Sequence, residues 1–439
     1  MHFNLERVVF NFMKKYELLI NDNNLLDTIN SDYLKRNNKL INFIRLLNNI
    51  NENFIISIDG EWGSGKTFFV NQLQYIRDNY NNIDFIKNNE DYLLEAKKFS
   101  TKYIPIYYNA WENDNHDDPL SSLIFNFLNE YPKFQRKPEK LTEEIFETIF
   151  PILKKIIVKK VNEYCDCITE DCFNNVKTFC SLAESIYTIE EKKTALNELF
   201  DKITDNDERI LLIVDEVDRC CPDYAVKLLE TLKHFYDNPN LTIVIATNNK
   251  QLSYTIKKYY GNDFDGYGYL NKIYDTVIKL EVDNIENYSE KYCEINKSDT
   301  LDGMVSIMLF KYLRFSYREC NRYTSMYNIV KRYRDYKSDF ASNNNKFVFC
   351  SNVLLPITLA LKIKDIDKYN NFVSGNGEDI MKSFIGFIEN LNDKSYIDWL
   401  YYIIPEVKKE KLIDIFIEKY NVIDIEKTDV VNYICFHYF

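Results

Sequence analysis

Short apolar runs alternate with helical patterns along the first 283 residues of the chain. Each run has the length of a buried strand and is followed by apolar residues at helical spacing. The four runs are residues 54–58, 103–108, 209–215 and 241–248. Buried strands that alternate with helices form a parallel sheet covered on both faces. The pattern predicts a doubly wound α/β fold with its ligand at the carboxyl ends of the strands.

The loop after the first run matches the phosphate-binding pattern G-x-x-x-x-G-K-[ST]. Three of the chain's 10 glycines lie in these eight residues, and glycine lets the backbone curl so that its N–H groups surround phosphate oxygens. Lys66 is expected to hold the β- and γ-phosphates during catalysis, and the Thr67 hydroxyl to ligate Mg²⁺. The predicted nucleotide-binding residues of this loop are Gly60, Trp62, Gly63, Ser64, Gly65, Lys66 and Thr67.

The third run ends in Asp215 and is followed by Glu216, and an apolar strand that ends in two acids is the Walker B pattern. Asp215 is expected to hold Mg²⁺ through water, and Glu216 to polarise the attacking water in phosphoryl transfer. The fourth run ends in Thr247 and Asn248, and either could be a sensor that contacts the γ-phosphate or the water. We assign that catalytic role to Asn248, although an ordinary strand-end turn explains the pair equally well. A glutamate beside Walker B and an extra strand before it are typical of the additional-strand class of NTPases.

The same patterns divide the chain into five predicted parts. In chain order they are N-terminal helices with the first half of the P-loop domain (1–130), a helical insertion (131–208), the second half of the P-loop domain (209–283), a helical lid (284–340) and an α-helical C-terminal domain (341–439). Within the first part we expect a turn between two helices at residues 21–24 and an irregular polar span at 79–98.

Composition and charge narrow the class of protein. The net charge of −12 on 439 residues argues against a broad nucleic-acid surface. No apolar run reaches 18 residues, and the nearest approach, 347–363, contains Pro356, which indicates a buried helix broken at that proline. The first seven residues lack the apolar core of a signal peptide. We therefore expect a cytoplasmic protein without an integral membrane segment. Its ten cysteines should be reduced thiols in that compartment. The cluster at 165–180 is disfavoured as a zinc site because it lacks paired C-x-x-C spacing and has no histidine nearby.

Taken together, these motifs resemble those of the KAP family of P-loop NTPases, over about residues 30–335. The matching pieces are residues 60–67 with a tryptophan inside the loop, 109–111 with 118–120 after them, 215–220, 222–230 and 242–248. The resemblance implies binding and hydrolysis of ATP with Mg²⁺ by a signalling or assembly ATPase. Many relatives carry transmembrane helices between the Walker motifs, whereas the insertion here is polar. Bacterial relatives are often linked to phage exclusion, which the resemblance adds as a candidate role.

A basic segment after the sheet domain admits three interpretations. Residues 311–337 contain eight Lys or Arg interleaved with tyrosines. Such a segment could be a nucleic-acid surface, a helical lid over the nucleotide or a solvated helix face. The stretch 316–322 resembles the Arg-bearing segment that follows the core in the KAP family. This likeness favours the lid and implies that Arg318 binds the nucleotide.

Contacts with other molecules are expected at two further places. Arg219 could act as an arginine finger on a neighbouring subunit's nucleotide, although pairing with Asp218 or Asp223 within the site is favoured. The C-terminal helical region has no catalytic motif. It is a candidate surface for a second copy of the chain or for a protein partner.

Three competing functions can be weighed from the residues alone. GTP is disfavoured because the guanine-type pattern at 296–299 follows a polar stretch and not a buried strand. A helicase is excluded because no second motor motif, Q-x-x-G-R-x-x-R, follows residue 280. Glu216 predicts that the chain is an enzyme that hydrolyses ATP. A switch or scaffold that binds ATP without hydrolysing it, and assembles with a protein partner, stays as the alternative.

Overall fold

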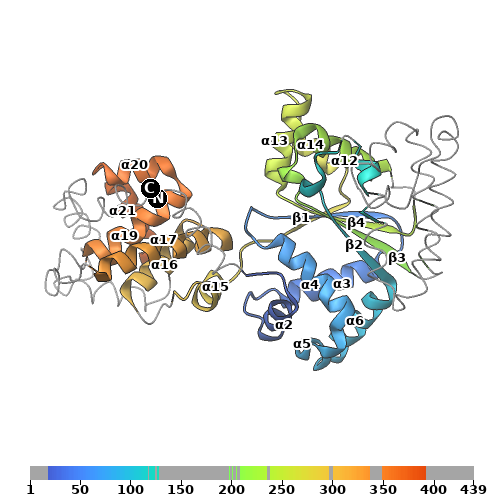
Figure 1. Ribbon diagram of the computed structural model, residues 1–439, viewed down its shortest axis with the longest axis horizontal. Coiled ribbons are helices and arrows are strands. Elements are labelled where there is room, and N and C mark those ends of the chain that lie inside the picture. The colour runs from blue at the N-terminus through green and yellow to red at the C-terminus, as the bar shows by residue number, and fades with distance from the viewer. Residues whose placement is uncertain are drawn as a thin grey trace, which may run out of the picture.

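The computed structural model describes residues 18–116, 118–123, 126–127, 197, 200, 204, 208–234, 238–295, 300–336 and 349–391. Figure 1 shows a parallel sheet with helices on both faces, and beside it a group of helices formed by later residues. We call these the core domain (described residues 18–284) and the helical domain (described residues 285–391). Nearly all of the predicted insertion, its cysteine cluster, and residues 392–439 lie outside the described residues.

The five strands of the core domain are all parallel, in the order β2-β3-β4-β1-β5. They are β1 (Phe54–Asp59), β2 (Tyr103–Asn109), β3 (Arg209–Asp215), β4 (Leu241–Thr247) and β5 (Thr276–Lys279). The predicted α/β fold with a parallel sheet is confirmed, and four of the strands follow the four apolar runs. The fifth strand was not predicted, because its four residues alternate between half-buried and exposed and form no apolar run.

The strand order places β4 between the strand that leads into the phosphate loop and the Walker B strand. The additional-strand arrangement is therefore present. Registers align the carboxyl ends, so that Asp59 lies beside Thr247 and Asn109 beside Asp215. Pro105 lies in β2 at the edge of the sheet, where a strand can lack an N–H donor on its open side.

Helices cover both faces of the sheet, as Figure 1 shows. One face packs against α3 (Asn37–Asn49), α4 (Lys66–Asn79) and α6 (Glu90–Lys102), and the other against α12 (Pro222–His234), α13 (Asn249–Tyr260) and α14 (Gly266–Asn271). Successive residues of a strand point to opposite faces. In β1, accordingly, Ile55 belongs to the core beneath α12 and α13, and Ile56 to the core beneath α3 and α4.

Two local predictions in the core domain are wrong. The span expected to be irregular holds α5 (Asp84–Lys87) and most of α6, whose N-cap Asn89 accepts a hydrogen bond from the Tyr92 amide. The expected turn at 21–24 instead begins α2 (Asp22–Ser31), where Asn21 is the N-cap. Asparagine favours helix N-caps as strongly as turns, so polar Asn-rich runs do not separate the two.

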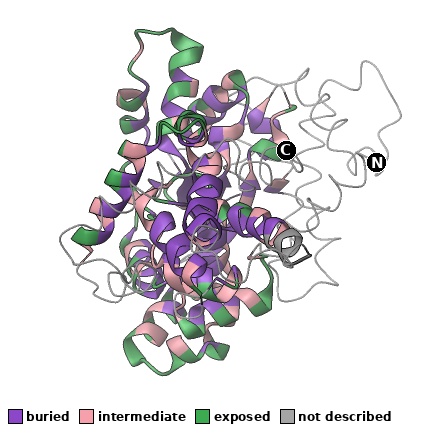
Figure 2. Ribbon diagram, turned by 90° about the vertical axis from the view of Figure 1, so that its left-hand side faces the viewer, coloured by how far each residue is buried: buried purple, intermediate pink, exposed green. Residues whose placement is uncertain are grey.

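The helical domain has one hydrophobic core shared by residues on both sides of the predicted lid boundary. Its helices are α15 (Ile285–Tyr292), α16 (Leu301–Tyr312), α17 (Tyr317–Tyr336), α19 (Leu355–Lys364), α20 (Ile366–Val373) and α21 (Glu378–Asn390). Figure 2 looks onto this domain and shows buried residues along the central helices. Pro356 lies in the first turn of α19, directly after a π-helical turn (Cys350–Leu354). The expected break at this proline is wrong: the backbone stays helical through it, and the π-helical turn accommodates the missing N–H. Of the helices in the described residues, none is both long and apolar enough to cross a bilayer.

Candidate nucleotide-binding site

The loop between β1 and α4 has the curled backbone that its glycines predict. Gly63 and Gly65 have φ values of 80° and 87°, in the left-handed region that side chains disfavour. Gly60 has no room for a side chain, because a Cβ there would lie 2.7 Å from the Leu280 carbonyl oxygen. Because α4 begins at Lys66, the amides of its first turn have no partner inside the helix. Loop and helix start thus form a cradle suited to phosphate.

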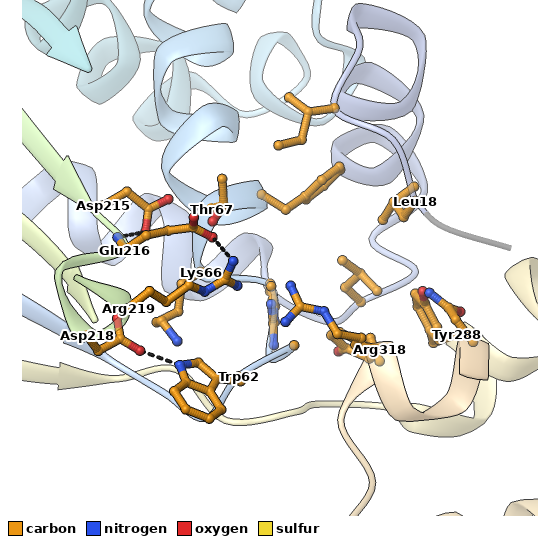
Figure 3. Close-up of a pocket in the computed structure, with 18 residues that line it drawn as sticks. Leu18, Trp62, Lys66, Thr67, Asp215, Glu216, Asp218, Arg219, Tyr288 and Arg318 are labelled. Carbon is orange, nitrogen blue, oxygen red and sulfur yellow. Dashed lines mark hydrogen bonds and ion pairs between the residues drawn. The ribbon is translucent and has the colours of Figure 1, made fainter. Parts of the chain in front are cut away.

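A cavity of about 170 Å³ lies over this loop, between the core domain and the helical domain. Figure 3 shows Lys66, Thr67 and Asp215 on one side of it and Arg318 and Tyr288 on the other. The Lys66 side chain is buried, and its Nζ donates to the Gly60 carbonyl at 2.7 Å. Burial lowers the pKa of Lys66, and nearby carboxylates oppose that shift. Phosphate oxygens would give this ammonium stronger partners than the loop carbonyl.

Asp215 and Thr67 meet at the base of the cavity. The buried Asp215 carboxylate accepts hydrogen bonds from the Tyr107 hydroxyl at 3.0 Å and from the Glu216 amide at 2.8 Å. Burial raises the pKa of Asp215, and hydrogen bonds, the first of them from Thr67, oppose the shift. Mg²⁺ is usually held by one or two protein oxygens together with water and phosphate oxygens. A carboxylate and a hydroxyl beside the phosphate cradle fit that ion.

Glu216 lies directly after Asp215, where the chain turns sharply. Its φ is 62°, and the turn returns its carboxylate to the Arg219 guanidinium at 2.9 Å (Figure 3). The same guanidinium lies over the Trp111 ring, 5.3 Å from the ring centroid. Burial raises the pKa of the Glu216 carboxyl, and Arg219 opposes that rise.

The partner predicted for Arg219 is therefore wrong: it pairs with Glu216 and not with either aspartate. Asp218 instead accepts hydrogen bonds from the Trp62 indole and from the Thr247 hydroxyl. Asp223 pairs with Lys227 at 2.6 Å. Sequence proximity alone could not separate these carboxylates, because the backbone turn at Glu216 decides which one faces the arginine.

The candidate sensor Asn248 caps α13, where its side-chain oxygen accepts a hydrogen bond from the Gln251 amide at 3.2 Å. It lies on a second, wider groove on the other side of the phosphate loop. Thr247 is buried, and its hydroxyl donates a hydrogen bond to Asp218, which also accepts one from Trp62 of the phosphate loop. The sensor role of Asn248 stays a prediction.

Arg318 comes from the first turn of α17 and lines the cavity opposite Glu216 (Figure 3). Ser316 and Glu319 form a capping box: the Glu319 amide donates to the Ser316 hydroxyl, and the Ser316 amide donates to the Glu319 carboxylate. This box fixes the start of α17 at the phosphate loop. Of the tyrosines that suggested a nucleic-acid surface, Tyr317, Tyr323 and Tyr327 are buried in the hydrophobic core.

Sequence reasoning missed two residues of the site. Arg36 is only 2% exposed and donates from Nη2 to the Ser64 carbonyl at 2.8 Å. Tyr107 holds the Asp215 carboxylate. Neither residue belongs to a motif quoted above. The one available signal was the position of Tyr107 near the end of a strand, where parallel sheets place functional side chains.

The phosphate loop follows β1, the Asp-Glu pair lies at the end of β3, and β4 lies between these two strands of the parallel sheet. This arrangement defines an additional-strand P-loop NTPase. A family model for the KAP family P-loop domain matches residues 31–306, more than half of the chain. The chain belongs to the KAP family of P-loop NTPases, and its P-loop domain is a nucleotide-binding domain. A search of curated proteins found no match.

Proposed function

We propose that the protein binds and hydrolyses ATP with Mg²⁺ and works as a nucleotide-driven signalling or assembly ATPase. The observation that carries the proposal is the position of Glu216, whose carboxylate lines the same cavity as Lys66 and Thr67. A carboxylate beside the phosphate cradle is what activation of an attacking water requires. Mg²⁺ would be held at Thr67 and Asp215, where it would neutralise charge on the phosphates.

Each side chain has a separate task in this proposal. Lys66 and the amides at the start of α4 would bind the phosphates. Arg318 would approach them from the helical domain, so that nucleotide would contact both domains at once. Glu216 would polarise the water once it is released from Arg219, since a carboxylate that is paired with a guanidinium is a weaker base.

The far end of the cavity suits a purine base, and the proposal of ATP over GTP rests on the sequence. Leu18 and Tyr288 lie there, away from Asp215 (Figure 3), and Leu34 and Phe68 also line the cavity. Aliphatic and aromatic side chains suit the flat, largely apolar faces of a purine base. Asn321 also lines the cavity, and its side-chain oxygen accepts a hydrogen bond from the Tyr288 hydroxyl. The guanine-type pattern at 296–299 lies outside the described residues.

A second candidate is a switch that binds ATP without turnover, and the Glu216–Arg219 ion pair is the observation that favours it. In that case a partner protein or a second copy would have to separate the pair before hydrolysis. Assembly through the C-terminal helical region, a cytoplasmic location and a role in anti-phage defence are parts of the proposal that rest on sequence and family resemblance.

The test is ATP turnover by the purified protein beside Glu216→Gln, with mass photometry of both samples with and without ATP. Glu112→Gln is the matched control, because it makes the same charge change at an exposed carboxylate. We expect Glu216→Gln alone to lose ATP turnover. This variant should still bind ATP, and in the presence of ATP it should remain in larger assemblies. Binding without turnover in every sample would favour the switch. Absence of ATP binding to the unaltered protein would overturn the proposal.

A further inference from the structure

Arg36 joins the phosphate loop to the segment that leads from the core domain into the helical domain. Its Nη2 donates to the Ser64 carbonyl at 2.8 Å and to the Glu281 carbonyl, just after β5, at 2.5 Å. Its Nη1 is so close to the loop that a Cβ on Gly65 would lie 3.0 Å from it. One side chain thus contacts two segments that are far apart in the sequence.

Asp283 and Tyr317 extend this contact to the first turn of α17. Arg36 Nε lies 3.6 Å from Asp283 Oδ2, and the guanidinium lies over the Tyr317 ring at 5.1 Å from its centroid. The Tyr317 hydroxyl donates to the Asp283 carbonyl at 2.5 Å. The Tyr317 amide donates to the Gly63 carbonyl at 3.1 Å. The loop, the connecting segment and α17 therefore share one network.

The Arg36 guanidinium is buried at a cost in solvation. The side chain is 2% exposed, and its Nε is buried without a hydrogen bond. Arginine is rarely buried to this degree, and the cost of removing a charge from water can exceed what its partners return. What distinguishes this side chain is the set of segments that it joins: the phosphate loop, the connecting segment and α17.

The peptide geometry indicates what the bond to the Ser64 carbonyl does. In a trans peptide the carbonyl and the following N–H point in opposite directions. A donor that holds the Ser64 carbonyl therefore fixes the direction of the Gly65 amide. That amide lies at the start of α4, where a phosphate would bind.

We propose that Arg36 is a positioning residue that orients the phosphate loop and transmits its occupancy to α17 in the helical domain. The inference rests on the proposed function, since it supposes a nucleotide over the loop. Filling the cradle would restrain the Gly65 peptide. Through the Ser64 carbonyl and the Arg36 guanidinium, this restraint would reach Asp283 and Tyr317.

The test compares Arg36→Gln with Lys39→Gln. Lys39 lies in the first turn of α3, and Arg36 is the N-cap residue of that helix. Lys39 pairs with Asp283 at 2.7 Å, so Lys39→Gln is a matched control that loses the same ion-pair partner while Arg36 keeps its bonds to the loop. We expect Arg36→Gln to bind ATP about tenfold more weakly, the loss of roughly one charge-assisted hydrogen bond. At saturating ATP, hydrogen exchange at residues 314–322 should slow in the unaltered protein and in Lys39→Gln, but not in Arg36→Gln.

Equal ATP affinity and equal exchange in Arg36→Gln and the unaltered protein would overturn the proposal. Equal losses of ATP affinity in Arg36→Gln and Lys39→Gln would also overturn it, because the effect would then come from the loss of the ion pair with Asp283.

If the unaltered protein binds no ATP, the proposed function fails. Hydrogen exchange measured without nucleotide then decides the inference: the amides of residues 63–65 should exchange faster in Arg36→Gln alone. If Arg36→Gln does not fold, Tyr317→Phe removes only the hydroxyl bond to Asp283. It should reduce the ATP-induced slowing at 314–322, and an unchanged response would refute the link.

Discussion

The Glu216 carboxylate and the Arg219 guanidinium are paired at 2.9 Å, within one turn that begins at a positive φ. The pair joins the proposed catalytic base to a cation that also lies over Trp111. Arg219 therefore controls both the charge and the direction of Glu216, and its removal should be visible in the pH dependence of hydrolysis.

Arg219→Ala should move the acid limb of the pH–rate profile to higher pH. Burial raises the pKa of Glu216 and Arg219 lowers it, so loss of the guanidinium raises this pKa further. A general base acts only when deprotonated, and the rate falls as pH drops through its pKa. The pH dependence of kcat/KM reports the free enzyme, in which the Glu216–Arg219 pair is formed, and would measure the shift. Arg219→Lys is the control that keeps a cation. An acid limb that stays in place in Arg219→Ala would show that another group is the base.

Lys66→Ala should weaken ATP binding by about 100-fold or more, since it removes a cation expected to make two charge-assisted hydrogen bonds to phosphate. Isothermal calorimetry measures the affinity directly. Lys250→Ala is the control, because this exposed lysine lines the wider groove and not the cavity over the loop. Similar affinities in the two variants would remove Lys66 from the site.

Tyr107→Phe should raise the Mg²⁺ concentration required for half-maximal turnover by about tenfold. The Tyr107 hydroxyl donates to Asp215, and loss of a group that orients a metal ligand typically costs this much in metal affinity. Tyr108→Phe removes a hydroxyl from the other face of the strand, where it contacts Ser122. A magnesium titration in which the two variants behave alike would contradict the assignment of Asp215 to the metal.

Gly63→Ala should do more damage than its backbone strain alone explains. Gly63 and Gly375 have φ values of 80° and 84°, so an alanine at either costs about 1–2 kcal/mol of left-handed strain. A Cβ on Gly63 would also lie 2.6 Å from the Arg318 Cβ, whereas one on Gly375 meets nothing within 4 Å. Gly63→Ala should therefore displace the start of α17 and weaken ATP binding, while Gly375→Ala lowers only the free energy of unfolding. Urea unfolding and calorimetry on both variants separate the two effects.

The parts of the fold that could be predicted are those specified by local pattern. Apolar runs predicted four strands, and the phosphate loop was found because its chemistry requires glycines and a lysine at fixed spacing. β5 has no such pattern; it is a strand because Ile56–Asp59 of β1 supplies its hydrogen-bond partners. Arg36 escaped notice because its partners, the Ser64 and Glu281 carbonyls, lie 28 and 245 positions away.

The predicted division between a lid and a C-terminal domain could not be derived from local pattern either. Residues 337–348, where the division was expected, lie outside the described residues. On either side of them, Tyr323 and Leu359 belong to the same hydrophobic core. Helical periodicity tells which face of each helix is apolar, but it does not tell which helices share a core.

The position of β1 in the sheet determines how long this strand stays unpaired during synthesis of the chain. This strand pairs Phe54 with Thr242 on one side and Ile56 with Thr276 on the other, so both of its neighbours are translated much later. At about 5–20 residues per second, β1 would leave the ribosome roughly 10–40 seconds before either partner is available. During that interval its isoleucines and its backbone hydrogen-bonding groups are open to other chains. The nascent chain is therefore open to incorrect strand pairing during that interval, and it acquires the complete nucleotide site only after Arg318 has been made.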